Sequence, residues 1–292
     1  MAILFALLSS FANAVTAVLQ RLASVSQSED LSGWRHAMAL VRDPRWLLGM
    51  VFFAGTFVFQ AIALYFGQLA VVQPILVTEL IFTLALRRLW LREPVAGHTW
   101  TAAVMICVGL ITFLVAARPE EGHRQATAGQ WAFALVVRAV IIVILVLASR
   151  FGSPARRAAL LGAAAAMVWA IDAAFVKAVT DVISQSGWLS LLEHWPLYAA
   201  IASGLIGTVL LQAAFAAGPL SASQSVILIV DPLASIALGM QLFGERLRTT
   251  PLALTCSILG LVVMAVGVVL ISTWAPPSSK TMSRHRHPKA AF

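Results

Sequence analysis

The chain alternates long apolar segments with short polar connections. Each apolar segment holds roughly 20 residues, the length an α-helix needs to cross about 30 Å of hydrocarbon. We place nine such segments, at 2–20, 46–66, 68–90, 99–117, 128–149, 157–180, 195–217, 219–243 and 251–273. The pattern predicts an all-α membrane protein of about nine transmembrane helices.

One stretch of sequence occurs in both halves of the chain. Residues 55–61 read Gly-Thr-Phe-Val-Phe-Gln-Ala, and residues 207–213 read Gly-Thr-Val-Leu-Leu-Gln-Ala. Each copy continues through a Gly-x-Leu-x-x-x-Gln turn, at 67–73 and 218–224, into another long apolar helix. The first four segments therefore correspond to the last four, five crossings later. An odd offset reverses orientation, so we expect two inverted four-helix repeats joined by a connector helix.

This correspondence divides the chain into four parts. They are a first repeat at 1–117, a connector with the fifth helix at 118–156, a second, inverted repeat at 157–273, and a tail at 274–292. The tail is rich in Pro, Ser, Lys, Arg and His, which predicts disorder. Residues 22–45 are polar and contain Trp, which favours a position along the membrane interface. A tenth crossing within 31–45 is rejected, because it would bury several basic side chains.

Composition supports a membrane protein. Hydrophobic residues make up 60% of the chain and charged residues 11%, against about a quarter charged in soluble domains. The net charge of +8 does not indicate nucleic-acid binding, because the basic residues lie in short loops between apolar segments. Most Lys and Arg follow the odd-numbered segments or lie in the tail. The positive-inside rule then predicts a plasma-membrane protein with its N-terminus outside and its C-terminus in the cytoplasm.

Two carboxylates lie in the middle of equivalent apolar segments. Glu79 is in the third segment and Asp231 in the eighth. A charge at the bilayer centre costs about 2.5–3.5 kcal/mol on insertion scales, so each requires a reason. We interpret them as protonatable or cation-binding groups that line a cavity. The alternatives are pairing with Arg138, or for Asp231 a kink at Pro232 that needs a polar neighbour.

Three further charged residues lie within predicted spans. Asp172, in the sixth segment, is a candidate for the same cavity. Lys177 is near the end of that segment and is expected to extend its amine toward the interface. Arg138, at the centre of the fifth segment, is expected to pair with a carboxylate; the alternative is that it binds an anionic group of a substrate.

Several uncharged polar residues are candidates for substrate contact or for joining helices. Gln60 and Gln212 occupy equivalent places in the two repeats, and Asn13 lies in the first segment. Their amides could bind a substrate, although hydrogen bonds between helices are the more common role. Four residues are expected to form turns or kinks: Gly67, Pro74, Gly218 and Pro232. Glu93 and Glu245 end their segments, where we expect them at the membrane surface, capping the following helix.

The sequence resembles the drug/metabolite transporter superfamily, and within it the NIPA-like magnesium transporters and the bacterial EamA-like permeases. The resemblance rests on Ser9-Ser10 through Leu19-Gln20-Arg21, Trp46 to Gly49, Gln60-Ala61, Val72-Gln73-Pro74, and Gly244-Glu245-Arg246-Leu247. The first-half counterpart of the last motif, Arg92-Glu93-Pro94, lacks its glycine. The resemblance covers most of residues 1–273 and implies a bundle of inverted repeats around a central cavity.

The function predicted is that of a secondary transporter, without a cofactor. It would move a small organic solute by alternating access, coupled to protons or another ion. The alternative is a NIPA-like carrier of Mg²⁺ or another divalent cation, with Glu79 and Asp231 as metal ligands. An intramembrane enzyme is disfavoured, because the His residues lie in loops and the tail and Ser203-Gly204 has no evident partner base on a facing segment. Substrate, direction, coupling ion and a homodimeric state stay open.

Overall fold

Local sequence signals fix where several helices begin. Asp43 accepts a hydrogen bond of 2.8 Å from the amide of Arg45, directly before Pro44 opens a helix. Thr127 and Gln130 form a reciprocal capping box at the start of another helix, with a 2.9 Å bond from the Thr127 amide to the Gln130 side chain. Both arrangements satisfy amide groups that a helix N-terminus otherwise leaves unpaired.

The computed structural model describes residues 1–26, 43–92, 95–120, 122 and 126–274. Its helices are α1 (Ala2–Ser26), α3 (Pro44–Phe66), α4 (Leu69–Leu76), α5 (Glu79–Leu89), α6 (Gly97–Ala117), α7 (Ala128–Ala148), α8 (Pro154–Ser186), η1 (Trp188–Glu193), α9 (Trp195–Ala217), α10 (Leu220–Leu238), η2 (Gly239–Phe243) and α11 (Pro251–Trp274). Most of the segment 22–45, the predicted cap at Glu93 and the tail from 275 onward lie outside the described residues.

The described part of the chain contains nine candidate membrane spans. They agree closely with the nine predicted segments, which confirms an all-helical, multi-pass membrane protein. Two spans differ from the expected single helices. The third is divided into α4 and α5, and the eighth, α10, ends in the π-helical turn η2. The sixth, α8, continues to Ser186, beyond the predicted end at 180.

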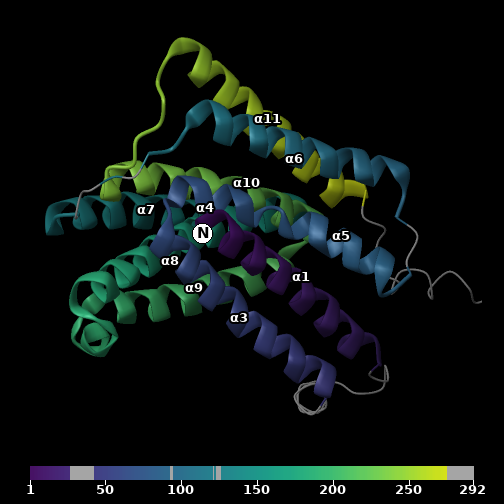
Figure 1. Cartoon of the computed structure of the whole chain (residues 1–292). Coiled ribbons are helices and arrows are strands. Elements are labelled where there is room, and N and C mark those ends of the chain that lie inside the picture. Colours follow the sequence, from purple (N-terminus) through teal and green to yellow (C-terminus); the bar gives the residue numbers. More distant parts are fainter. Residues whose placement is uncertain (27–42, 93–94, 121, 123–125, 275–292) are drawn as a thin grey trace, which may run out of the picture.

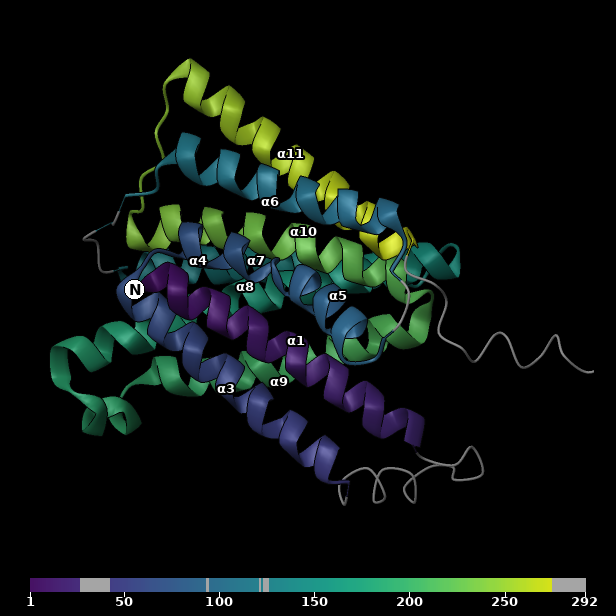
Figure 2. The same ribbon diagram turned by 45° about the vertical axis from the view of Figure 1, so that its right-hand side comes forward.

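Helix α8 is the centre of the bundle. It packs against α9, α10 and α7, while α1 packs against α3 and α5 (Figure 1). About two thirds of the most apolar part of α8 is buried. The buried residues include many alanines, which let neighbouring helices approach closely. Helices α6 and α11 form a pair at one edge of the bundle in both views (Figure 2).

Glycines bring α6 and α11 into backbone contact. A Cβ atom on Gly260 would lie 2.7 Å from the carbonyl oxygen of Gly109 and 2.7 Å from the amide nitrogen of Phe113. Such distances leave no room for any side chain at this crossing. Small residues at helix crossings are typical of membrane bundles, where packing rather than water exclusion drives association.

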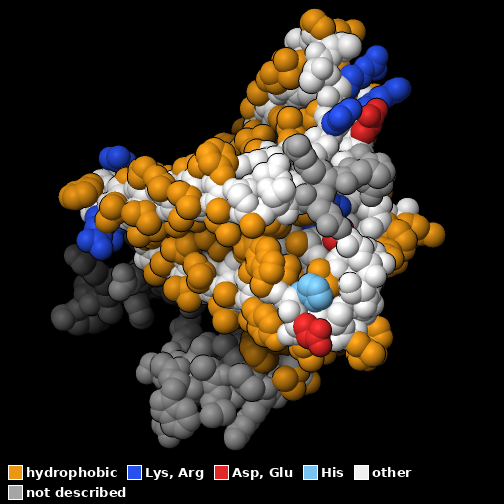
Figure 3. Space-filling view, turned by 90° about the vertical axis from the view of Figure 1, so that its left-hand side faces the viewer, with side chains coloured by type: hydrophobic (Ala, Val, Ile, Leu, Met, Phe, Trp, Pro, Cys, Tyr) orange, Lys and Arg blue, Asp and Glu red, His pale blue; other side chains and the backbone are white. Residues whose placement is uncertain are grey.

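The outer faces of the helices are apolar. On α6, Val104, Val108, Ile111 and Val115 follow a helical spacing, and each is more than 50% exposed. Figure 3 shows hydrophobic side chains over much of the face it presents, with Lys and Arg near the edges. An apolar surface bounded by basic side chains fits contact with a lipid bilayer.

Candidate functional site

A break in the third span places Glu79 at the start of a helix. Pro74 lacks an amide hydrogen, and α4 ends two residues later, at Leu76. The chain turns through Val77 and Thr78, and Glu79 then begins α5. A carboxylate in the first turn of a helix is favoured by the partial positive charge of the exposed amides.

A hydroxyl group from α1 supports this break. Ser10 Oγ donates to the carbonyl of Ile75 at 3.3 Å and lies 3.4 Å from that of Leu76, besides its 2.9 Å bond to Ala6 in its own helix. The carbonyl of Ile75 also accepts from the amide of Thr78 at 2.9 Å and from its hydroxyl at 2.7 Å, so residues on both sides of the break satisfy it. The motif Ser9-Ser10 therefore has a structural role next to Glu79.

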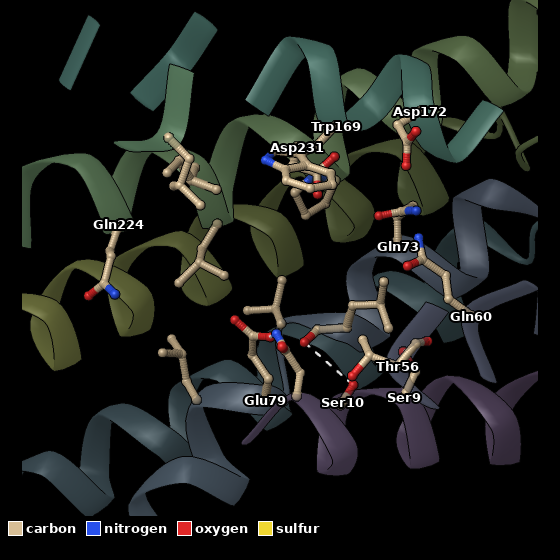
Figure 4. A pocket seen from close by; sticks show the side chains of 18 of the residues that line it. Ser9, Ser10, Thr56, Gln60, Gln73, Glu79, Trp169, Asp172, Gln224 and Asp231 are labelled. Atoms are coloured by element: carbon tan, nitrogen blue, oxygen red, sulfur yellow. Dashed lines mark hydrogen bonds between the residues drawn. The ribbon is translucent and has the colours of Figure 1, made fainter. Parts of the chain in front are cut away.

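Next to this break lies a cavity of about 320 Å³. Its walls come from α1, α3, α4, α5, α8, α9 and α10 (Figure 4). The polar side chains that line it are Ser9, Ser10, Asn13, Thr56, Gln60, Gln73, Glu79, Asp172, Gln224 and Asp231. The cavity thus brings together polar residues of both sequence repeats, which the sequence analysis had placed on separate segments.

All three predicted membrane carboxylates line this cavity, and each has an uncharged hydrogen-bond partner. Asp172 accepts a bond of 2.7 Å from Ser203, and Asp231 accepts one of 3.3 Å from Ser235. Glu79 accepts a hydrogen bond from the amide of Asn13. These contacts orient the carboxylates but do not neutralise their charge.

Basic side chains do not line the cavity in the described part of the chain. Arg138 is buried elsewhere, where it donates to the Gln241 side chain at 3.1 Å and to the Ala134 carbonyl at 3.2 Å. The expected pairing of Arg138 with a carboxylate is therefore corrected: among the described residues its hydrogen-bond partners are an amide and a carbonyl. The position also gives no support for a contact with a substrate in this cavity.

Lys177 is buried within the bundle, next to the junction of the second and third spans. Only 7% of its surface is exposed, and its ammonium group donates to the carbonyls of Gly67 at 2.9 Å and Leu64 at 3.4 Å. The aromatic ring of Phe243 lies 5.5 Å from the same nitrogen. Lys177 thus binds the end of α3, whose last carbonyls carry partial negative charge.

Glu245 is buried as well, at the junction of α3 and α4. Its carboxylate accepts hydrogen bonds from the amides of Leu69 at 2.7 Å and Ala70 at 2.9 Å, at the start of α4. It therefore caps a helix of the first half rather than the helix that follows it in sequence. The preceding Gly244 has φ 67°, a left-handed conformation that favours glycine and turns the chain back toward α4.

The two predicted glutamines of the repeat differ in their relation to the cavity. Gln60 lines the cavity, whereas Gln212 is outside it and its neighbour Leu211 is part of the wall. Gly67 and Gly218 lie at the α3–α4 and α9–α10 junctions. Pro232 lies within α10 and touches the cavity beside Asp231.

Gln73 is a lining residue that the sequence analysis did not select. It is 2% exposed, and its Nε2 atom is the buried side-chain nitrogen without a hydrogen-bond partner among the described residues. Gln224 also lines the cavity, and both residues end the repeated Gly-x-Leu-x-x-x-Gln turn. The repeat of glutamine at this place was the signal that could have identified them.

Apolar and aromatic residues complete the walls. Phe53 and Phe57 come from α3, Trp169 from α8 and Phe215 from α9. These rings were not predicted as site residues. The sequence pattern of an apolar segment does not distinguish an aromatic residue that lines a cavity from one that faces lipid or the core. The cavity therefore combines acidic groups, amides and aromatic faces.

The described residues contain no group of three or more His, Cys, Asp or Glu side chains close enough together to hold a metal ion. Glu79 and Asp231 therefore do not form an all-protein metal site with a third such residue.

Ser203 corrects another interpretation. It does have a carboxylate neighbour on a facing helix, Asp172, although no partner had been evident from the sequence.

Comparisons with known proteins give one informative similarity. No protein-family model matches the chain, and no solved structure matches it. An uncharacterized protein of Corynebacterium glutamicum is 28% identical over 275 residues, which are 93% of this chain and 94% of that protein. The similarity thus extends through both halves of the membrane bundle.

Proposed function

We propose that the chain is a secondary carrier of the drug/metabolite transporter superfamily that moves a small organic solute by alternating access. The observation that carries the proposal is the shared cavity, to which each repeat contributes a carboxylate, Glu79 and Asp231. Ionisable groups within a membrane bundle are costly and usually mark the pathway of a substrate or ion. The resemblance of the sequence to this superfamily supports the same function.

Inverted repeats would supply the two states that alternating access requires. Helix α1 packs against α3 as α8 packs against α9, in agreement with the proposed correspondence of the two halves. Each repeat then contains a glycine junction. A Cβ on Gly67 would meet Ala2 near the start of α1, and one on Gly218 would meet Ala158 near the start of α8. Two similar halves of opposite orientation can open a central site to either side.

The carboxylates provide a means of coupling. Asp231 lies within electrostatic reach of both Asp172 and Glu79, and uncharged groups are their hydrogen-bond partners. Three ionised carboxylates in an apolar bundle would repel one another at considerable cost. A proton or a bound cation can remove that cost, so exchange between the two would link substrate movement to a proton gradient.

Positive-inside topology gives the proposed orientation. Arg87 and Arg88 lie in the last turn of the third span, and Arg150, Arg156 and Arg157 follow the fifth. These loops would face the cytoplasm, with the N-terminus outside. We propose the plasma membrane as the location.

Transport of Mg²⁺ is the second candidate, favoured by the three acidic side chains in the cavity. Mg²⁺ often binds through one or two carboxylates and keeps several waters. The separation of the carboxylates argues against a compact ligand cage. Mg²⁺ entry into proteoliposomes, with wild type beside Glu79→Gln and Asp231→Asn, tests this candidate. Saturable entry that both variants lose would replace the organic-solute proposal.

We do not propose an enzyme. His98 and His194, the histidines of the described residues, are outside the cavity. Ser203 bonds to Asp172 directly, without a histidine between them to accept and return a proton. A role for Ser203 in orienting Asp172 fits these contacts better than nucleophilic attack.

Accessibility from the two sides of the membrane tests the carrier function without knowledge of the substrate. Cys107 and Cys256 are replaced by Ala, and single cysteines are introduced at Thr56 and Gln224 in the cavity. A membrane-impermeant thiol reagent is then applied to right-side-out or inside-out vesicles. A carrier is labelled at both positions from both sides.

The matched control is Val108→Cys, which lies on the outward apolar face of α6 and is expected to resist the reagent from either side. Labelling of the cavity positions from one side alone, under all ion gradients tried, would contradict alternating access.

A further inference from the structure

The charge of the cavity restricts what it can hold. Three of its lining residues are acidic, and Lys, Arg and His are absent from its lining among the described residues. A solute anion would therefore meet repulsion from Glu79, Asp172 and Asp231 without a positively charged side chain to compensate it. The carboxylate of a zwitterion would meet the same repulsion.

The aromatic walls favour one kind of positive charge. Phe53, Phe57, Trp169 and Phe215 present rings to the cavity that also contains the acids. Aromatic faces attract organic cations through the ring quadrupole, and the attraction is larger where water is excluded. A hydrated inorganic ion gains little from such walls, since its water shell keeps the rings at a distance.

Gln73 adds a requirement for a neutral hydrogen-bond acceptor. Its Nε2 atom is buried and has no partner, although the residue lines the cavity and is 2% exposed. In Figure 4 it lies beside Gln60 in the view, with Asp172 above both. Buried donors are nearly always satisfied, so an orphaned donor on a residue that lines a cavity favours a group supplied by a ligand.

We infer that the cavity binds a small organic cation, an amine or quaternary ammonium compound that also carries a hydroxyl or carbonyl oxygen. The ammonium group lies among the three carboxylates and the aromatic rings, and the oxygen accepts the hydrogen bond from Gln73. This names the substrate class of the proposed carrier and so rests on that function. The volume of about 320 Å³ is at the lower end for ligand pockets and fits a compact solute.

Three matched probes separate the contributions of charge and hydroxyl group. Choline has both, dimethylbutanol has a carbon in place of the quaternary nitrogen, and ethyltrimethylammonium lacks the hydroxyl. Binding to the purified full chain in nanodiscs is measured by calorimetry and by the fluorescence of Trp169, with Trp169→Phe identifying its share of the signal. We expect choline to bind at least about tenfold more tightly than dimethylbutanol, a difference of about 1.4 kcal/mol.

Variants connect the preference to named residues. Asp172→Asn and Asp231→Asn are expected to reduce choline affinity about tenfold or more, with little effect on dimethylbutanol. Glu193→Gln, an exposed acid outside the cavity, is the matched control. Gln73→Leu is expected to remove the preference for choline over ethyltrimethylammonium, which a single hydrogen bond sets at about fivefold. Size-exclusion profiles verify that each variant is folded.

Two results would overturn the inference. One is equal affinity for choline and dimethylbutanol in the wild type, and the other is no binding of choline above that to empty nanodiscs. The carrier function fails separately. Cation binding without any flux in proteoliposomes would contradict transport and leave the cation site, whereas flux of neutral or anionic solutes alone would support transport and overturn the cation site.

Discussion

The ammonium group of Lys177 donates a 2.9 Å hydrogen bond to the carbonyl of Gly67, so a side chain of the second half binds the end of a helix in the first. Glu245, also of the second half, accepts hydrogen bonds from the amides of Leu69 and Ala70, which begin α4 just after Gly67. The α3–α4 junction thus receives a positive charge at its carbonyl end and a negative charge at its amide end. Each charge complements the partial charge of the helix terminus it meets.

Replacement of Lys177 by Met is expected to destabilise the protein. The change retains much of the side-chain volume but removes the charged donor, leaving the carbonyls of Gly67 and Leu64 without this partner. Hydrogen bonds from charged groups contribute about 1.5–3 kcal/mol, so we expect a loss in that range. Thermal unfolding in detergent measures it. Arg157→Met, on the exposed start of α8, is the control and is expected to change stability little.

The charges at the junction are expected to be coupled. Glu245→Gln retains one acceptor for the amides of Leu69 and Ala70 but loses the negative charge. Each single change removes one of the two opposite charges at the junction, whereas the double variant with Lys177→Met removes both. The double variant should therefore lose less stability than the sum of the two single losses. Additive losses in a double-mutant cycle would show that the two side chains act independently.

The close crossing of α6 and α11 should not tolerate a side chain. Gly260→Leu would place a Cβ atom 2.7 Å from the Gly109 carbonyl oxygen, so the helices must separate. Overpacking of this kind costs about 1–3 kcal/mol. Gly129→Leu, on an open face of α7, is the control because nothing lies within 4 Å of its Cβ position. Equal stability of the two variants, measured by thermal unfolding, would refute the close approach.

Apolar length predicted the spans well, because each bilayer-spanning helix must be about as long as the hydrocarbon is thick. It did not predict the division of the third span after Pro74, since a proline in a membrane helix can be accommodated by a kink alone. At the break the Ile75 carbonyl accepts hydrogen bonds from Thr78 and from Ser10, a residue on another helix. Contacts of this kind carry no signal in the local pattern.

The same limit applies to the partners of the charged residues. Lys177 was placed near a span end because apolar residues stop at about 180, but polar residues such as Asp181 and Gln185 continue α8 to Ser186. Glu79, Asp172 and Asp231 were identified because a carboxylate in an apolar segment is rare. Gln73 was not predicted as a site residue, because polar residues are common at turns. That its Nε2 atom lacks a hydrogen-bond partner can be seen only in the structure.

Transport measurements should divide the membrane-embedded polar residues into two groups. Glu79→Gln and Asp231→Asn alter groups that line the cavity, so we expect loss of most flux of choline into proteoliposomes. Arg138→Gln and Gln212→Leu change equally unusual membrane residues that are outside it, and flux per folded molecule is expected to stay within about twofold of the wild type. The Arg138 change should instead lower thermal stability, because Gln241 and the Ala134 carbonyl lose a charged donor. If Arg138→Gln abolished flux while the protein stayed folded and the cavity variants transported normally, the cavity would not be the pathway.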